Sequence, residues 1–287
     1  MQTHALWSES ARRIGALASA AILLCSFSAC SAPRLSGKAE AERQMSPCEQ
    51  ALTLVNDDSW NGTGTPMTVR YVAGQSVPLA WIDVAASCPG RFGEGVLRNA
   101  QSKAKLASLA QRLSAVTPSS SPARLDGVTA MTMDTDVLDA MALAEDRAGF
   151  ALEVLAAQGR TAGATLQLSD LHKSAGQQLV SLADGSWNTA GDTGASGTHA
   201  DPRQKVYDIS TLLANPVTID DKPSGQTVPT AAAIEMDCAR AEIKAVTDSD
   251  SPSDTTTLSI LAALAAKHAY AAFQLGYPTA DADLFER

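Results

Sequence analysis

The residues of this sequence best able to carry chemistry are one carboxylate and two imidazoles that interrupt apolar series with helical spacing. Glu145 stands in a series whose members alternate by three and four positions: Leu138, Met141, Glu145, Ala148, Leu152 and Leu155. This spacing is that of the buried seam of a packed helix. A carboxylate at such a position is expected to be either a structural polar contact or part of a chemical site.

The two histidines can be placed on comparable seams. His268 belongs to a series with the same alternating spacing: Leu258, Leu261, Ala265, His268, Ala272 and Leu275. His172 can be placed in the same way on a second helix, although Leu171 gives an equally good seam. On a third helix, Cys238 lies in the apolar series and Glu242 lies at its edge. These side chains are therefore candidates to converge inside a helical bundle.

Two roles are open for such a cluster. Neutral imidazole nitrogens and carboxylate oxygens suit zinc and related transition metals, so Glu145, His172 and His268 could bind a single metal ion, to which Cys238 would add a thiolate. The alternative is structural, because a glutamate that faces a histidine in a bundle core can form a hydrogen-bonded pair that satisfies both groups. The sequence favours the structural role, which needs no cofactor.

Other catalytic patterns are missing from the sequence. A di-iron carboxylate centre needs Glu-x-x-His on two helices, but the residues three positions before the last three histidines are Ser169, Ser196 and Ala265. No Gly-x-Ser-x-Gly, phosphate-binding glycine-rich loop or Cys-x-x-Cys occurs. These absences favour a non-enzymatic protein, although they do not decide whether it is an enzyme.

Four long helices are expected to position the candidate residues. They span about 134–158, 165–183, 229–246 and 254–275, with Gly and Pro residues at several of their ends. A long connection rich in Gly, Thr, Asp and Pro separates the second helix from the third, and it contains one short helix between 201 and 216. Two helices, a long crossover and two more helices is the topology of a ferritin-like four-helix bundle. The predicted fold class is therefore all-α.

The same region resembles a known family. The motifs are Ala144-Glu145-Asp146 on the first helix, Leu171-His172 on the second, the stretch from Tyr207 to Val217, and the alanine-rich last two helices. They are similar to an uncharacterised ferritin-like domain found in actinobacterial proteins, over residues 134–276. The resemblance implies the fold and no particular activity, because that family has no settled function.

An N-terminal helical unit, residues 46–116, is expected before the bundle. Ser46, Pro47 and Glu49 have the spacing of a capping box that starts a helix, and a longer helix is expected over 91–113. Between these helices, 78–86 is expected to be helical and 67–72 could be a short extended segment. Residues 117–133 are the predicted linker to the bundle, and 277–287 the predicted C-terminal tail.

The cysteines predict one disulfide. Cys48 and Cys88 both lie in the N-terminal unit, whereas Cys238 lies in the middle of a helix elsewhere. In an oxidising compartment the first two are expected to pair, and a loop of that length would stabilise the fold by about 4 kcal/mol. The alternative is three buried, reduced thiols.

The first residues have the features of an export signal. Arg12 and Arg13 precede an apolar run, 14–27, that is too short for a confident membrane span. Small residues directly before Cys30 resemble a bacterial lipobox, so that removal of residues 1–29 would leave Cys30 acylated. Plain secretion and an uncleaved anchor are the alternatives, and the export route, general or twin-arginine, is left open.

The net charge of the chain limits the classes of partner that are expected. Its formal net charge is −9 and it has no cluster of Lys and Arg, so nucleic acid is excluded as an expected partner. Residues 30–45 have no apolar period and are expected to be a flexible tether, so membrane attachment would depend on the lipid at Cys30. The alanine-rich helices would also permit a homodimer.

The sequence therefore predicts an exported protein that is lipid-anchored at the outer face of the cell membrane. Its expected role is a non-enzymatic binding or scaffold module with an unknown protein or cell-envelope partner. The alternative is a metal-binding or redox bundle that uses the Glu and His cluster.

Two similar stretches carry tryptophans. Residues 58–62 and 184–188 place Trp60 and Trp187 after predicted helices. Neither stretch has the glycine and terminal glutamate of a calcium-binding loop. Both are interpreted as turns whose tryptophan folds onto the helices, and the alternative is that an exposed tryptophan stacks on a sugar.

Overall fold

The computed structural model describes residues 45–116, 125–185, 199–250 and 253–285. All of the helices and strands in these ranges belong to one compact unit, Ser46–Arg287. The predicted signal peptide, the lipidation site Cys30 and the tether up to residue 44 lie outside the described residues. Within the described ranges, no helix combines the length and the apolar character needed to cross a membrane.

Four long helices follow the predicted order and confirm a mostly helical fold. They are α8 (Thr135–Gln158), α9 (Leu166–Ala183), α11 (Thr230–Thr247) and α12 (Thr255–Gln274). Two of them begin at side chains that cap a free backbone N–H group: Thr165 accepts from the Leu168 amide and Asp254 from the Thr257 amide. Helix α8 ends at Gly159, whose φ of 65° is left-handed and suits glycine.

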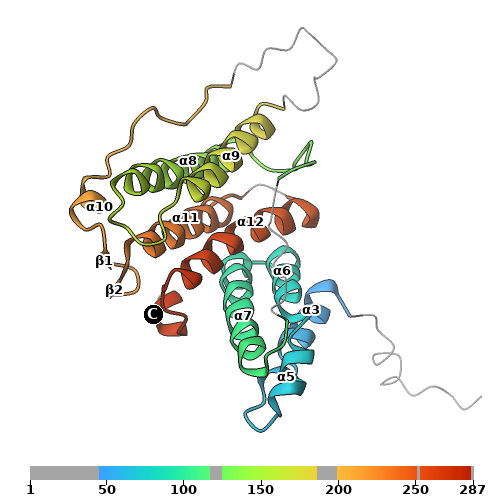
Figure 1. Cartoon of the computed structure of the whole chain (residues 1–287). Helices are drawn as coiled ribbons and strands as arrows, with labels where there is room; N and C mark the ends of the chain where they lie inside the picture. Colours follow the sequence, from blue (N-terminus) through green and yellow to red (C-terminus); the bar gives the residue numbers. More distant parts are fainter. Residues whose placement is uncertain (1–44, 117–124, 186–198, 251–252, 286–287) are drawn as a thin grey trace, which may run out of the picture. The chain divides into compact units, whose positions relative to one another are not determined.

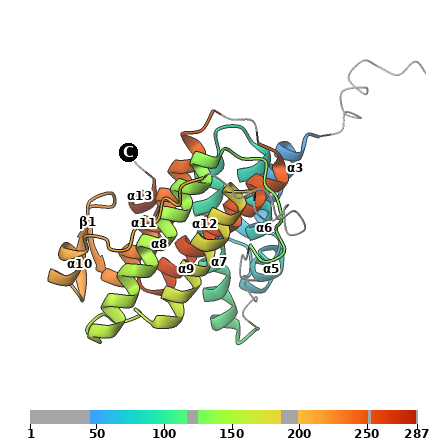
Figure 2. The same ribbon diagram turned by 90° about the horizontal axis from the view of Figure 1, so that it is seen from above.

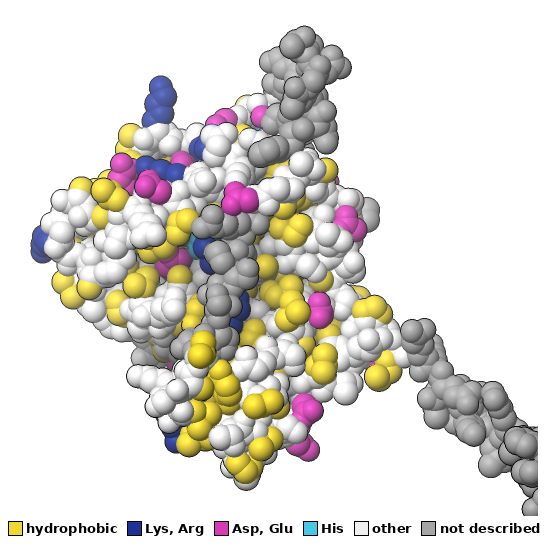
Figure 3. Space-filling view, turned by 45° about the vertical axis from the view of Figure 1, so that its right-hand side comes forward, with side chains coloured by type: hydrophobic (Ala, Val, Ile, Leu, Met, Phe, Trp, Pro, Cys, Tyr) yellow, Lys and Arg dark blue, Asp and Glu magenta, His cyan; other side chains and the backbone are white. Residues whose placement is uncertain are grey.

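These helices pack as two pairs. Figure 1 shows α8 beside α9, and α11 beside α12, and the turned view in Figure 2 agrees with the first pairing. Contacts also join α8 to α11, so the two pairs share one interior. The largest part of that interior is apolar and includes Leu138, Leu179 and Leu261. On the face shown in Figure 3, Lys and Arg side chains are scattered and form no continuous stripe.

The N-terminal helices are shorter. They are α3 (Pro47–Val55), α4 (Asp58–Asn61), α5 (Met67–Ala73), α6 (Val77–Ser87) and α7 (Phe92–Leu113). The capping box is confirmed, because the Ser46 hydroxyl accepts from the Glu49 amide while the Glu49 carboxylate accepts from the Ser46 amide. Gly95 permits close packing of α7 on α6, since a Cβ there would lie 2.6 Å from the Trp81 carbonyl oxygen.

The extended segment predicted over 67–72 is wrong, because α5 is a helix. Its β-branched residues Thr68, Val69 and Val72 favour a strand by propensity. A strand without a neighbour would leave its backbone groups unpaired, whereas a helix pairs them locally, as in the bond from the Arg70 amide to the Pro66 carbonyl.

The N-terminal helices share a core with the four long helices. Ile82 of α6 and Val96 of α7 belong to the same apolar cluster as Leu138 and Leu261. Both α6 and α7 contact α12. Most of the predicted linker is described from Leu125 onward, and Leu125 is itself buried in this cluster. The described residues therefore show no break in the packing between the predicted N-terminal unit and the predicted bundle.

The connection between α9 and α11 contains more regular structure than its sequence indicates. The predicted short helix is reduced to α10 (Ser210–Ala214), and an antiparallel hairpin of β1 (Thr218–Asp221) and β2 (Gln226–Pro229) follows it. Gly225, with a φ of 68°, makes the turn possible. In the predicted tail, a short helix α13 (Asp281–Leu284) packs Leu284 against the core. Trp187 lies outside the described residues.

The predicted disulfide is present. Cys48 at the start of α3 is bonded to Cys88 at the end of α6, with their Cα atoms 5.0 Å apart. Cys238 is a free, buried cysteine on α11. The bond therefore closes a loop within the N-terminal helices.

Loss of this disulfide should destabilise the protein by about 4 kcal/mol, because the reduced unfolded chain gains the freedom of the open loop. Urea unfolding of the wild type with and without a reducing agent measures the difference. The Cys48→Ser, Cys88→Ser double variant should have the stability of the reduced wild type and should not respond to the reducing agent. An unchanged unfolding midpoint in the double variant would contradict the assignment.

Candidate functional site

Four ionisable side chains meet in the interior of the four long helices, one from each helix. They are Glu145 on α8, His172 on α9, Glu235 on α11 and His268 on α12, here called the Glu-His cluster. Glu145, His172 and Glu235 are 0% exposed and His268 is 1% exposed. The sequence predicted Glu145, His172 and His268 as candidates, and the structure brings all three together.

Small residues allow α8 and α9 to approach closely beside the cluster. A Cβ on Gly176 would lie 3.1 Å from the Ala142 carbonyl oxygen, and one on Gly149 would lie 3.2 Å from the Cβ of His172. The Ser169 hydroxyl donates a hydrogen bond of 2.7 Å to the Gly149 carbonyl. These contacts bring the backbone of α9 to the distance at which His172 reaches Glu145.

Each carboxylate of the cluster contacts both imidazoles. Glu145 Oε2 is 2.5 Å from His172 Nδ1, and Glu145 Oε1 is 3.0 Å from His268 Nε2. Glu235 Oε1 is 3.0 Å from His172 Nε2, and Glu235 Oε2 is 3.1 Å from His268 Nδ1. Every ring nitrogen and every carboxylate oxygen of the four residues therefore has a partner within the cluster.

The imidazole rings of His172 and His268 are stacked. Their centroids are 4.5 Å apart and their planes differ by 20°. Because Nδ1 and Nε2 lie on different sides of a ring, the two carboxylates lie at different edges of the stacked pair. At one edge Glu145 contacts His172 Nδ1 and His268 Nε2. At the other edge Glu235 contacts His172 Nε2 and His268 Nδ1.

The lowered pKa values of Glu145 and Glu235 indicate that both carboxylates are ionised, and this fixes the charge state of the imidazoles. An ionised carboxylate can only accept, so an imidazole that contacts a carboxylate through both nitrogens must carry a proton on each and is positively charged. Two imidazolium and two carboxylate groups make the cluster neutral as a whole. This neutrality is what allows four ionisable groups to be buried together.

The pKa shifts agree with that charge state. Burial is the largest single influence and acts to lower the pKa of His172 and of His268, but the charges and hydrogen bonds of the neighbouring carboxylates, led by Glu145, together outweigh it and raise both pKa values. Burial acts to raise the pKa of the two glutamates, but the histidine charges outweigh it. They bring the pKa of Glu145 well below its ordinary value and lower the pKa of Glu235 to about 2.

Cys238 lies at the Glu145 edge of the cluster. Its Sγ atom is 4.0 Å from Glu145 Oε2 and 4.0 Å from His172 Nδ1. Burial, followed by the charge of Glu145, raises the pKa of the thiol well above its ordinary value. Cys238 is therefore a neutral thiol beside the cluster in the metal-free protein.

Glu242, one helical turn after Cys238, differs from the clustered glutamates. It is 0% exposed, and neither of its carboxylate oxygens has a hydrogen-bond partner among the described residues. Burial raises its pKa well above the ordinary value, which favours the protonated form of the side chain in the folded protein.

The arrangement can hold a metal ion. One ligand atom each from Glu145, His172, Cys238 and His268 lies within 4.8 Å of the other three. Two nitrogens, one oxygen and one sulfur are all ligands that zinc accepts. Glu235 is not part of this set although it contacts the same imidazoles, because it lies at their other edge.

Sequence reasoning missed Glu235. The apolar series on this helix that contains Cys238 also contains Ile234, four positions earlier, and this series places the neighbouring Glu235 off the seam. Glu235 is nevertheless three positions before Cys238 and seven before Glu242, which is the spacing of residues on one helical face. That spacing of three polar residues is the signal that could have identified it.

Comparison of the chain with models of protein families, with curated proteins and with solved structures finds no match. The resemblance to an actinobacterial ferritin-like domain therefore stays a prediction. The functional argument depends on the geometry of the site itself.

The charge state of the cluster predicts the effect of Glu235→Gln in metal-free protein. At pH 6 this substitution should cost about 3–5 kcal/mol, because two buried imidazolium groups lose a shared carboxylate. Glu235 contributes its stability fully above its unfolded pKa of 4.5, and that contribution disappears as the pH falls toward its folded pKa of about 2. The difference from wild type, measured by urea unfolding with a chelator, should therefore shrink steadily below pH 4.5.

Glu242→Gln is the matched control on the same helix, and it should act in the opposite direction. A raised folded pKa means that Glu242 destabilises the protein above pH 4.5, where the unfolded chain is ionised. Replacement by the neutral amide should remove that cost and raise the stability at pH 6. Equal destabilisation by both substitutions would contradict an ionised Glu235.

Proposed function

We propose that the protein binds a single divalent transition metal ion at the Glu145 edge of the Glu-His cluster. The observation that supports this most strongly is the orientation of the two imidazoles. His172 and His268 each direct one nitrogen toward Glu145 and the other toward Glu235. Metal-binding histidines typically give their second ring N–H to a carboxylate, which fixes the tautomer and the ring orientation. Glu235 is placed to serve as that carboxylate.

The ligands would be Glu145, His172 Nδ1, His268 Nε2 and Cys238 Sγ. In the metal-free protein the two nitrogens carry protons, which a bound ion would replace. Exchange of two imidazole protons for one dication leaves the charge of the Glu-His cluster unchanged. The buried site can therefore accept a dication without a new uncompensated charge, and a thiolate at Cys238 would add one further negative charge.

Only small movements are needed. Ligand atoms around a tetrahedral zinc ion with bonds of about 2.0–2.1 Å are separated by roughly 3.3 Å. The present distances from Glu145 to the two imidazole nitrogens are 2.5 Å and 3.0 Å. These two contacts would lengthen by less than an ångström, and Cys238 Sγ, 4.0 Å from Glu145 Oε2, would move inward.

We further propose that the four long helices form a ferritin-like bundle. Two observations support it: the long connection between α9 and α11, and the alternation of carboxylate and imidazole along the chain. Di-iron bundles carry a glutamate on two helices and Glu-x-x-His on two others. Here Glu145 and Glu235 match the single glutamates, while Ser169 and Ala265 replace the glutamates of the two motifs. The remaining ligands suit one ion rather than two.

The N-terminal sequence supports the proposal that this metal-binding bundle is exported and anchored by a lipid at Cys30 to the outer face of the cell membrane. A binding role is compatible with the non-enzymatic module expected from the sequence, with the metal ion as the ligand. A scaffold role toward a protein or cell-envelope partner, and a homodimer, stay predictions.

Metal analysis tests the proposed function. Chelator-stripped, full-length protein titrated with Zn²⁺ in a calorimeter should bind one ion per chain, and His268→Ala should abolish stoichiometric binding because it removes one of the two nitrogen ligands. Mn²⁺ and Fe²⁺, the latter without oxygen, are titrated in parallel to establish preference.

His199→Ala is the control for these titrations. His199 is outside the cluster and interacts with Asp139, with 2.8 Å between His199 Nε2 and Asp139 Oδ1. This variant should bind the metal like the wild type. Failure of all three ions to bind stoichiometrically, or equal loss in both variants, would contradict the proposal.

A further inference from the structure

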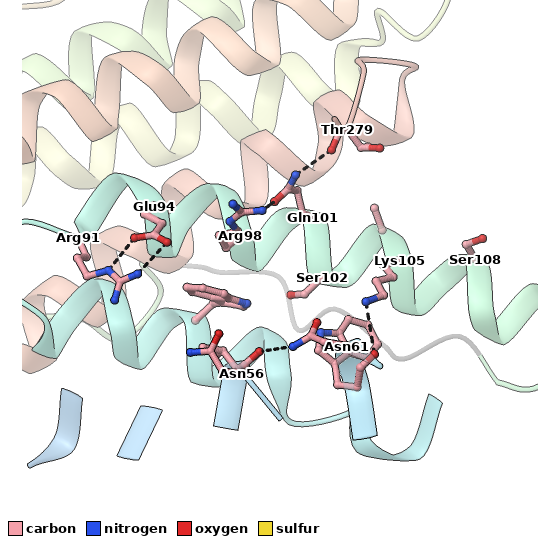
Figure 4. Close-up of a pocket in the computed structure, with 14 residues that line it drawn as sticks. Asn56, Asn61, Arg91, Glu94, Arg98, Gln101, Ser102, Lys105, Ser108 and Thr279 are labelled. Atoms are coloured by element: carbon pink, nitrogen blue, oxygen red, sulfur yellow. Dashed lines mark hydrogen bonds and ion pairs between the residues drawn. The ribbon is translucent and has the colours of Figure 1, made fainter. Parts of the chain in front are cut away.

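A cavity in the N-terminal helices forms a second candidate site, separate from the Glu-His cluster. Its volume is about 750 Å³, and residues of α7, of α4, of α6 and of the end of α3 line it. Figure 4 shows these residues around the cavity. The volume is within the range of small-molecule pockets, about 300–1,000 Å³. The cavity is therefore large enough for a ligand.

One face of α7 supplies a polar stripe to this cavity. Its residues have the alternating three-and-four spacing of a single helical face: Arg91, Glu94, Arg98, Gln101, Lys105 and Ser108. Other residues of α7, such as Val96 and Leu106, are buried and apolar. The stripe is thus the polar side of an amphipathic helix, and it offers donors and acceptors to a ligand rich in hydrogen-bonding groups.

The rest of the lining adds two tryptophans and two amides. Trp60 is 3% exposed, while Trp81 is only partly buried. The Asn61 amide nitrogen donates to the Val55 carbonyl, and the Asn56 amide nitrogen donates to the Leu52 carbonyl. Each amide keeps its oxygen as an acceptor. Indole surfaces beside fixed polar groups suit a sugar, whose ring has apolar C–H faces and polar hydroxyl groups at its edge.

The charges of the cavity are unevenly compensated. Arg91 Nε is 2.7 Å from Glu94 Oε2, and Arg98 forms two hydrogen bonds with Asp281, of 2.7 Å and 2.9 Å. Lys105 has only weaker partners. Its ammonium group lies 3.9 Å from the centroid of the Trp60 ring and 3.5 Å from the Trp60 carbonyl oxygen. No carboxylate pairs with it among the residues that the structure describes.

A second cation lies near Lys105. Arg70 is close enough to lower the pKa of Lys105, in addition to the larger effect of burial. The Arg70 Nε atom is buried and has no hydrogen-bond partner within the described part of the chain. Arg70 does not line the cavity, so at this end the lining itself carries the positive charge of Lys105, in a chain whose net charge is −9. An anionic group would supply the missing partner.

We propose that the cavity binds an acidic carbohydrate, whose sugar ring lies against Trp81 and whose carboxylate or phosphate group contacts Lys105. The polar stripe of α7 would contact the hydroxyl groups. This site is independent of the metal site, since it shares no residue with the Glu-His cluster.

Calorimetry with full-length protein and three probes tests the proposal. Trigalacturonic acid carries carboxylates, glucose 6-phosphate carries a phosphate, and maltotriose is neutral. At least one acidic probe should bind about tenfold or more tightly than maltotriose, because a charge-assisted contact is worth at least that factor. The acidic probe that binds identifies the anionic group.

Three variants locate the binding. Lys105→Gln should weaken the acidic probe about tenfold or more, and Ser108→Trp, at an exposed position of the stripe, should block the cavity without disturbing the core. Lys103→Gln is the matched control, because Lys103 lies 6.0 Å from the Tyr270 ring and does not line the cavity. Binding of no probe, equal binding of maltotriose, or equal effects of Lys103→Gln and Lys105→Gln would overturn the proposal.

Discussion

The pairing of two imidazolium groups with two carboxylates in the interior of the four long helices is the interaction on which the arrangement of these helices depends. Each helix contributes one of these groups, and each group is bonded to two others. None of the four could be buried alone at acceptable cost, because an isolated charge in a protein core is strongly unfavourable. The cluster therefore constrains all four helices together.

Such a cluster is a poor way to gain stability. A buried ion pair is often no more stabilising than apolar residues of the same size, although removal of one partner is costly. The placement of Cys238 beside Glu145 is a feature that this ion pairing does not require. Its thiol completes the set of four side chains that could hold a metal ion, and this supports the metal site that we propose.

The sequence predicted most of the helices and part of the site, for identifiable reasons. The regular spacing of apolar residues located Glu145 and His268, but it could not decide whether His172 or Leu171 faces the interior. The structure decides this, because the side chain of His172 is 0% exposed and that of Leu171 is 37% exposed. Glu235 was missed because the apolar series through Ile234 and Cys238 places it off the seam. Residues 67–72 were misassigned because their β-branched residues favour a strand by propensity. Whether a strand forms also depends on a neighbouring strand to pair with, which is a property of the tertiary structure.

The most direct test of the central claim is a crystal structure of the protein grown with Zn²⁺, with anomalous scattering measured on either side of the zinc absorption edge. The account predicts one strong anomalous peak at the edge of the stacked imidazoles, between Glu145, His172, His268 and Cys238, with Glu235 still bonded to the other two ring nitrogens. An interior without a peak, in which the ring of four hydrogen bonds is intact, would contradict it.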